Sequence, residues 1–289
     1  FVGYDIPVAP TAFKAEEKDG KVALSWTAPT EGQNGGYINP DELVYTIYRG
    51  GDEAAVIAPA AKGLAFEDTG LDGDAMQYFV YYTIVPVSKA GSGDYAVSDA
   101  LIFGKPYTGN FTESFSDGAT QNNPWVMYRV KGQTQLWGLY SQGQSPACAP
   151  VDNDYGVATF SATSGRIGDE GRLVSPKLNL SKMTLPMLSF YIYHKVSMDT
   201  QYGEEPFADR MIPELQLPDG SYVPLDEAIY VDDPTKTDGW YKYEYDLSKY
   251  RDKEYVKLSF HGIADYEQDV NMDLVQVTNR ISNDLAVYT

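Results

Sequence analysis

The feature that most constrains this chain is a series of short alternating segments between Val22 and Ile84. Residues 22–26, 43–49 and 77–84 combine β-branched and aromatic residues, and Gly, Pro, Asn or Asp stands near their ends. Such residues fit the half-buried surface of a strand, and the residues between the segments favour turns. A large side chain on every second residue predicts two packed sheets that each bury one face. We therefore expect an all-β sandwich fold.

The first 104 residues contain seven segments of this kind. Seven short strands separated by turn residues are typical of an immunoglobulin-like sandwich of about 100 residues. The expected strands cover residues 12–15, 22–27, 43–49, 54–57, 64–67, 78–87 and 96–103. We expect a first β-sandwich domain over residues 1–104.

The order of motifs in residues 1–104 resembles a fibronectin type III module. These motifs are Pro10-Thr-Ala-Phe, Leu24-Ser-Trp-Thr-Ala-Pro, Tyr45-Thr-Ile-Tyr-Arg, Phe66-Glu-Asp-Thr-Gly-Leu and Lys89-Ala-Gly. The resemblance implies that Trp26 is the buried tryptophan of the second strand, which fills the space between the sheets. Val80 stands where such modules usually carry a corner tyrosine, with Tyr78 and Tyr82 on either side. We therefore assign no tyrosine corner.

A short Pro/Gly linker, residues 105–110, precedes a second strand-rich region, residues 111–280. The steps Gly171-Arg-Leu-Val-Ser-Pro and Leu185-Pro-Met-Leu-Ser-Phe, together with Trp125, are its landmarks. This region resembles the jelly rolls of the MAM and cleaved-adhesin group, which occur in vertebrate adhesion receptors and gingipain-type bacterial proteins. The resemblance implies a larger jelly roll with Trp125 in its core. Residues 281–289 are expected to be a tail or the start of a further module.

A candidate metal site lies in the run Asp152-Asn-Asp-Tyr-Gly. Asp152 and Asp154 offer carboxylates on alternate residues and Gly156 lets the loop turn, a pattern that suits calcium. The alternative is that both are turn residues that cap their own backbone. The jelly rolls that the chain resembles often hold calcium near their first and last strands, where Glu113 and Asp273 lie. The expected calcium ligands are therefore Glu113, Asp152, Asp154 and Asp273.

A candidate ligand surface lies in the aromatic stripe that begins at Trp240. On a strand, Tyr241, Tyr243 and Tyr245 share one face because side chains alternate. Exposed tyrosines in a row could stack on sugar rings or contact a protein partner. The alternative is that they are ordinary core residues, which the frequency of aromatics in strands favours.

Cys148 and the two histidines invite comparison with cysteine hydrolases. Cys148 lies in Ser-Pro-Ala-Cys-Ala-Pro, without the helix N-terminus that would lower the pKa of a nucleophilic thiol. We therefore expect a small buried or loop cysteine. His194 and His261 lie in strand-like runs and are expected to be hydrogen-bonded strand residues.

Paired carboxylates could indicate a glycosidase, which needs two of them facing each other across a cleft. The candidates are Glu204, Glu205, Asp209, Glu214, Asp232 and Asp233. The chain holds 41 acidic residues, so pairs of this kind arise by chance. Catalysis is the minority hypothesis, and we expect no enzyme.

The net charge of −19 excludes some partners. A surface this negative repels phosphate backbones, which argues against nucleic-acid binding, and it is compatible with hard cations. No apolar run approaches the roughly 18 residues that cross a bilayer. A single cysteine excludes an intrachain disulfide and fits either a cytosolic protein or a bacterial surface protein.

These observations favour a non-catalytic, secreted or cell-surface binding segment. The first module would be a spacer and the second would face the ligand. Its resemblance implies bacterial adhesion to glycan or protein ligands, with further domains in the same polypeptide. Two alternatives remain open. The chain could be an accessory carbohydrate-binding region of a larger secreted hydrolase, or a structural spacer without a ligand.

Overall fold

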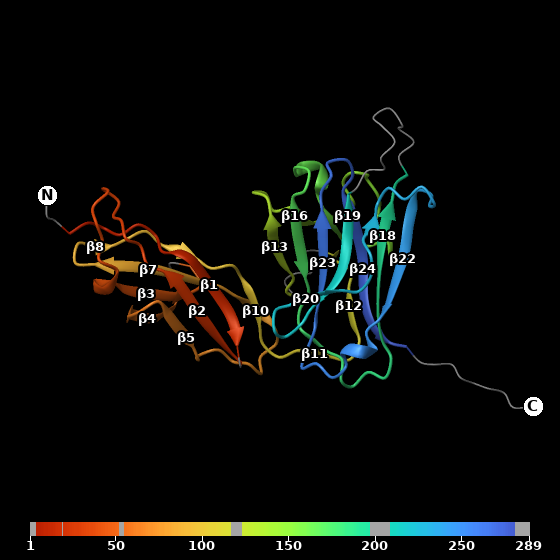
Figure 1. The fold of residues 1–289 in the computed structure, drawn as a ribbon. Helices are drawn as coiled ribbons and strands as arrows, with labels where there is room; N and C mark the ends of the chain where they lie inside the picture. Colours follow the sequence, from red (N-terminus) through yellow and green to blue (C-terminus); the bar gives the residue numbers. More distant parts are fainter. Residues whose placement is uncertain (1–3, 19, 52–54, 117–122, 197–208, 281–289) are drawn as a thin grey trace, which may run out of the picture. The chain divides into compact units, whose positions relative to one another are not determined.

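The computed structural model describes residues 4–18, 20–51, 55–116, 123–196 and 209–280. The chain divides into two compact units, Phe1–Lys105 and Pro106–Thr289. Both units consist of β-strands with short 3-10 turns, so the all-β prediction is confirmed (Figure 1). Among the described residues, every helix is too short or too polar to cross a lipid bilayer.

Unit 1 is built from two main sheets and one strand pair (Figure 1). The first sheet has the order β1-β2-β5, with β1 Thr11–Lys18, β2 Lys21–Thr27 and β5 Ala65–Asp68. The second has the order β4-β3-β7-β8, with β3 Val44–Arg49, β4 Ala55–Ala61, β7 Tyr82–Ser88 and β8 Gly91–Ser92, and β9 Ala96–Val97 also pairs with β7. The pair consists of β6 Tyr78–Val80 and β10 Leu101–Phe103, and a 3-10 turn covers Pro40–Glu42.

The core of unit 1 lies between its two main sheets. Alternation along β2 buries Val22, Leu24 and Trp26, the last with only 4% of its surface exposed. The Trp26 ring meets the ring of Tyr45 on β3 edge to face, with centroids 4.9 Å apart. Because β2 and β3 belong to different sheets, this aromatic contact joins the two layers.

A buried polar cluster also links the two sheets of unit 1. Asp68, at the end of β5, accepts hydrogen bonds from Arg49 Nε at 2.8 Å and Nη2 at 2.7 Å. Tyr82 on β7 donates its hydroxyl to the same carboxylate at 2.8 Å. Burial raises the pKa of Asp68, but the hydrogen bonds from Arg49, Gly70 and Tyr82 outweigh it and hold the pKa below its usual value. Tyr82 therefore has a buried hydrogen-bond partner in Asp68, a contact that the sequence did not predict.

We expect Asp68→Ala to lower the free energy of unfolding of unit 1 by about 3 kcal/mol, because Tyr82 and Arg49 lose their shared acceptor. Glu67→Ala is the matched control, since its ion pair with Lys21 is exposed and contributes less than about 1 kcal/mol. Urea unfolding of both variants measures the difference. Equal losses would contradict the role assigned to Asp68.

Unit 2 is a sandwich of two six-stranded sheets. The first has the order β14-β15-β24-β18-β22, with β12 also on β24; the bounds are β12 Phe111–Glu113, β14 Trp137–Tyr140, β15 Val157–Phe160, β18 Pro186–His194, β22 Gly239–Asp246 and β24 Val270–Asn279. The second has the order β13-β16-β23-β19-β20, with β21 also on β19; the bounds are β13 Val126–Lys131, β16 Glu170–Val174, β19 Arg210–Gln216, β20 Tyr222–Pro224, β21 Ile229–Tyr230 and β23 Lys257–Ile263. Two 3-10 turns cover Ala162–Ser164 and Ser248–Tyr250.

Part of the expected linker belongs to unit 2. Tyr107 and Thr108 form β11 (Tyr107–Thr108), which pairs in parallel with β17 (Leu178–Asn179). The ring of Tyr107 stacks on that of Phe111 with centroids 6.1 Å apart. This segment is therefore held by backbone hydrogen bonds and an aromatic contact rather than serving as a free spacer.

Aromatic side chains fill the space between the sheets of unit 2. Phe190 on β18 meets Phe260 on β23 edge to face, with centroids 5.1 Å apart, so the contact crosses from one sheet to the other. Trp125 stacks on Phe260 at 6.2 Å and is 2% exposed. These contacts place Phe190 at the centre of the core, directly beside the edge strand β22.

Candidate ligand pocket and candidate metal site

The tyrosine stripe lies on β22, the edge strand beside β18 (Figure 1). The register pairs Tyr243 with Phe190, so the tyrosine face points to the core side of the sheet. The rings of Tyr243 and Tyr245 both stack on Phe190, with centroids 5.8 Å apart and interplanar angles of 16° and 21°. Both are half-buried. The hypothesis of exposed tyrosines is therefore wrong for Tyr243 and Tyr245, because the edge strand packs both rings against the core.

A pocket of about 530 Å³ opens beside these rings. The aromatic part of its wall is Tyr230, Tyr243 and Tyr245, and the chain segment that leads from β20 to β22 supplies the rest. Its ionisable groups are Asp226, Glu227, Asp232, Asp233 and Lys236. Tyr241 belongs to the same strand face but does not line the pocket. Its hydroxyl accepts a hydrogen bond from Thr237 N at 3.0 Å. A rigid aromatic wall with a few convergent polar groups is the usual composition of a small-molecule site.

Lys236 is held in a fixed position at this pocket. Its Nζ lies 2.6 Å from Asp233 Oδ2 and 5.8 Å from the centre of the Tyr243 ring. Hydrogen bonds from Lys236 and Thr235 hold the pKa of Asp233 well below its usual value. The pocket therefore carries one ammonium group, paired with a carboxylate that stays charged. Nothing in the sequence pattern marks Lys236, because the tertiary fold brings its segment onto β22.

His194 supports the pocket from behind. It is fully buried at the end of β18, and its Nε2 lies 2.8 Å from the Tyr243 hydroxyl. Burial, with a further contribution from the charge of Lys236, lowers the pKa of His194 to about 4. The imidazole is therefore neutral at physiological pH, and its hydrogen bond fixes the Tyr243 hydroxyl.

We expect the stability of unit 2 to fall as the pH drops from about 6.5 to about 4. Over this range the unfolded imidazole binds a proton that buried His194 does not bind, so folding becomes less favourable by up to about 3 kcal/mol. His194→Gln should lose this part of the pH dependence, whereas Tyr243→Phe keeps the buried imidazole and should retain it. The test is the free energy of unfolding at pH 7 and pH 5. An unchanged difference between wild type and His194→Gln at the two pH values would contradict the expectation.

The candidate metal site brings together three of the four predicted carboxylates. One oxygen each from Asp152, Asp154 and Asp273 lies within 4.8 Å of the others. Asp273, on β24, is fully buried and accepts hydrogen bonds from Val151 N and Leu274 N at 2.8 and 2.6 Å. Burial raises the pKa of Asp273 to about 7, and the charges of the other two carboxylates act in the same direction. A hard cation would relieve this repulsion, so the donor set fits calcium.

Asp152 and Asp154 also cap the backbone of their own turn. Asp152 Oδ1 accepts a hydrogen bond from Asp154 N at 3.2 Å, and Asp154 Oδ1 accepts one from Gly156 N at 3.0 Å. Each carboxylate uses one oxygen in this way, so the second oxygen remains for a cation. Turn capping and metal ligation are compatible at these two residues.

The structure does not bring Glu113 into this carboxylate group. Its Oε1 accepts a hydrogen bond from Phe115 N at 2.9 Å, and its Oε2 accepts one from Trp125 Nε1 at 3.0 Å. Glu113 is 2% exposed, so both oxygens serve buried donors of its own neighbourhood. The expectation that Glu113 is a fourth ligand is wrong because its carboxylate lies outside the group that Asp152, Asp154 and Asp273 form.

Cys148 and the histidines have separate surroundings. Burial raises the pKa of the Cys148 thiol to about 12, so the sulfur stays protonated and is a poor nucleophile. Its backbone forms an isolated bridge with Gly143. His194 contacts Tyr243, as described above, and His261 lies in a network of charged residues on the other sheet.

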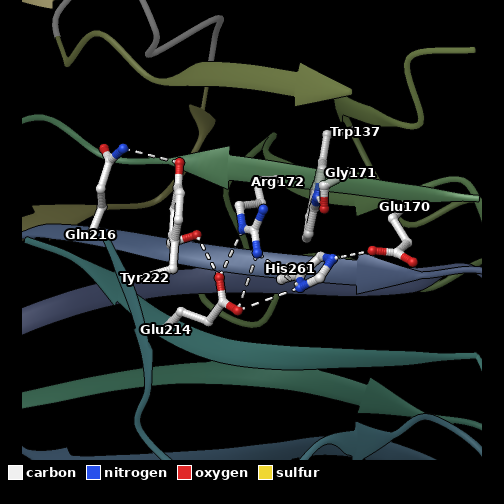
Figure 2. Close-up of polar contacts among 9 residues, drawn as sticks. Trp137, Glu170, Gly171, Arg172, Glu214, Gln216, Tyr222 and His261 are labelled. Carbon is white, nitrogen blue, oxygen red and sulfur yellow. Dashed lines mark hydrogen bonds and ion pairs between the residues drawn. The ribbon is translucent and has the colours of Figure 1, made fainter. Parts of the chain in front are cut away.

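Figure 2 shows this network, which crosses β16, β23 and β19. Arg172 Nε donates to Glu214 Oε2 at 2.8 Å, and His261 Nε2 lies 3.0 Å from Glu170 Oε2. The Arg172 guanidinium also lies 4.0 Å from the centre of the Tyr222 ring. Burial raises the pKa of Glu214, but hydrogen bonds from His261 and Arg172 outweigh it and hold it low. The network ties neighbouring strands together, and the sequence offered no signal for it.

The remaining acidic candidates have individual roles. Asp209 accepts hydrogen bonds from the backbone amides of residues 265–268 and so holds that loop. Asp232 and Asp233 line the pocket, Glu214 belongs to the charged network, and Glu204 and Glu205 lie outside the described residues. Among the described candidates, Asp209 and Glu214 therefore accept hydrogen bonds that hold the fold together.

The chain matches no protein-family model and no curated protein. Among solved structures it is similar to the K1 cleaved adhesin domain of Lys-gingipain from Porphyromonas gingivalis W83, at 15% identity and a TM-score of 0.42, covering 60% of this chain and 99% of that one. A Fn3-like protein from Clostridium thermocellum shares 22% identity at a TM-score of 0.25, covering 36% and 97%. A xylan-binding domain from Paenibacillus barcinonensis shares 16% identity at a TM-score of 0.31, covering 58% and 92%.

Proposed function

We propose that this chain is a non-catalytic, extracytoplasmic binding segment whose unit 2 recognises an uncharged glycan. The observation that carries the proposal is the pocket of about 530 Å³ walled by Tyr230, Tyr243 and Tyr245. Phe190 and His194 hold the Tyr243 ring and hydroxyl from behind, so the wall is formed before a ligand arrives. Adhesion at a bacterial cell surface is the setting in which we place this activity.

The chemistry of the pocket favours a sugar without charge. The apolar face of a sugar ring can pack on an aromatic wall, and its hydroxyls can both donate and accept hydrogen bonds. Four carboxylates and one ammonium group surround the space. The excess negative charge disfavours uronic acids and sulfated sugars. A protein ligand remains the competing possibility, and it would use the same tyrosines.

Two other roles share this fold. An accessory carbohydrate-binding region of a larger secreted hydrolase would have the same pocket and would differ only in the parent polypeptide. A structural spacer would have no ligand. The sequence of the full gene distinguishes the first, and binding measurements distinguish the second.

We expect Tyr230→Ala to weaken glycan binding about tenfold, the scale of one lost aromatic contact. Tyr140→Ala is the matched control, because its side chain is similarly exposed (39% against 45%) and does not line the pocket. Soluble xylan and mannan are the first probes, because both are neutral polysaccharides. Titration calorimetry on the whole chain measures the affinity. Failure to bind any member of a broad glycan array would overturn the proposal, and binding of matrix proteins alone would replace the glycan with a protein ligand.

We also propose that calcium binds Asp152, Asp154 and Asp273. Calcium at about 100 times its Kd should raise the melting temperature of unit 2 by about 5–10 °C, because it binds only the folded site. Asp273→Asn should abolish the shift, whereas Asp252→Asn, at an exposed position outside the group, should keep it. Calorimetry with calcium and with a chelator measures the effect. A melting temperature that neither treatment changes would contradict calcium binding.

A further inference from the structure

Unit 1 has a surface hollow of its own, which a spacer role does not use. The hollow has a volume of about 340 Å³. Tyr4 and Tyr37 line it and are 68% and 76% exposed, so neither ring is needed by the core of unit 1. Asn39, Glu42 and Lys89 supply polar groups. We call this feature the Tyr4–Tyr37 cleft.

Asp5 holds the loop that presents Tyr37. It is 9% exposed and accepts hydrogen bonds from the backbone amides of Asn34 and Gly36 at 3.1 and 2.9 Å. The Asn34 side chain donates to the other carboxylate oxygen at 2.8 Å. Backbone bridges at Pro7–Gly32 and Glu31–Tyr37 close the loop on both sides. The backbone at Tyr37 is therefore held in place before any ligand binds.

Two glycines let the loop close around this carboxylate. A Cβ on Gly32 would lie 2.4 Å from the Asp5 carboxyl carbon, and a Cβ on Gly36 would lie 2.8 Å from Asp5 Oδ2. Side chains at these positions would force the loop away from Asp5. The run Gly32-Gln-Asn-Gly-Gly-Tyr is thus shaped to bring an aromatic ring to the surface rather than to bury it.

Lys89 contacts Tyr4, the other aromatic residue of the cleft. Its Nζ lies 3.0 Å from Glu42 Oε2 and 3.3 Å from the Tyr4 hydroxyl, and 5.0 Å from the centre of the Tyr4 ring. The Asn39 amide donates to Glu42 Oε1 at 3.3 Å. A second hollow of about 470 Å³ also has Glu42 and Lys89 in its wall, so the two hollows adjoin at this ion pair.

We infer that the Tyr4–Tyr37 cleft is a second saccharide-binding site, selective for uncharged sugars. Two exposed rings offer stacking surfaces, and the paired charges of Lys89 and Glu42 in the same wall offer donors and acceptors for hydroxyl groups. The Glu42 carboxylate offsets the Lys89 ammonium, and Asp5 adds a second carboxylate to the wall, so the cleft does not favour an anionic sugar. A proline-rich peptide would favour a mainly aromatic groove, whereas most residues that line this cleft are polar or charged. The inference does not depend on the pocket of unit 2.

The test uses the whole chain carrying Tyr230→Ala, which weakens the pocket of unit 2, and adds Tyr37→Ala. The control adds Tyr95→Ala instead, because Tyr95 is 66% exposed and lies outside the cleft. The probes are neutral oligosaccharides of xylose, mannose, glucose and galactose, measured by titration calorimetry. Backbone hydrogen exchange over residues 32–39 is followed with and without each sugar.

We expect Tyr37→Ala to weaken the remaining binding about tenfold, and Tyr95→Ala to leave it unchanged. Saturating sugar should slow hydrogen exchange over residues 32–39 in the control. Tyr4→Ala should reproduce the effect of Tyr37→Ala, which separates a lost contact from a disturbed loop. The inference is overturned if no neutral sugar binds in a manner that depends on Tyr37, or if only a proline-rich peptide does so. Loss of the unit 2 pocket alone leaves these readouts intact, so the two proposals fail separately.

Discussion

The stacking of Tyr243 and Tyr245 on Phe190 is the contact on which the functional interpretation of unit 2 depends. Phe190 meets Phe260 across the sandwich, so the ring that anchors the pocket is also a central ring of the core. The pocket therefore shares the rigidity of the sandwich although it opens at the edge of a sheet. A wall of this kind loses little conformational freedom when a ligand binds, which favours recognition by a preformed surface.

Acidic residues in this chain have two different physical roles. Some are internal hydrogen-bond acceptors that hold loops or cross-link sheets, as Asp5, Asp68 and Asp209 do. Others, such as Asp152 and Asp154, stand near one another at more exposed positions, where like charges repel unless a cation joins them. The first group differs from the second because its carboxylates are buried and accept hydrogen bonds from several donors. A list of carboxylates in the sequence cannot separate them, which is why the acidic pairs kept catalysis open as a minority hypothesis.

The two proposed ligand sites present tyrosine rings to a ligand in different ways. The pocket of unit 2 uses strand tyrosines backed by the core, whereas the cleft of unit 1 uses a loop tyrosine that a buried carboxylate positions. Each pairs a lysine with a carboxylate, Lys236 with Asp233 and Lys89 with Glu42. Such pairs place directed donors and acceptors, which suits a ligand rich in hydroxyl groups.

Alternation in the sequence was sufficient to predict strands, the all-β class, and the shared face of Tyr241, Tyr243 and Tyr245, because side-chain direction in a strand repeats every second residue. The burial of Trp26 was predicted only through the resemblance to a fibronectin type III module. It could not say which face is buried, since that depends on the partner strand. Only the tertiary structure turned the tyrosines toward Phe190 and brought Lys236 close to Tyr243. It also decided that Glu113 accepts a hydrogen bond from the Trp125 indole. Phe190 and Tyr243 lie far apart in the chain, and the contacts of Lys236 and Glu113 depend on the path of a loop. Local sequence patterns encode neither strand order nor loop path.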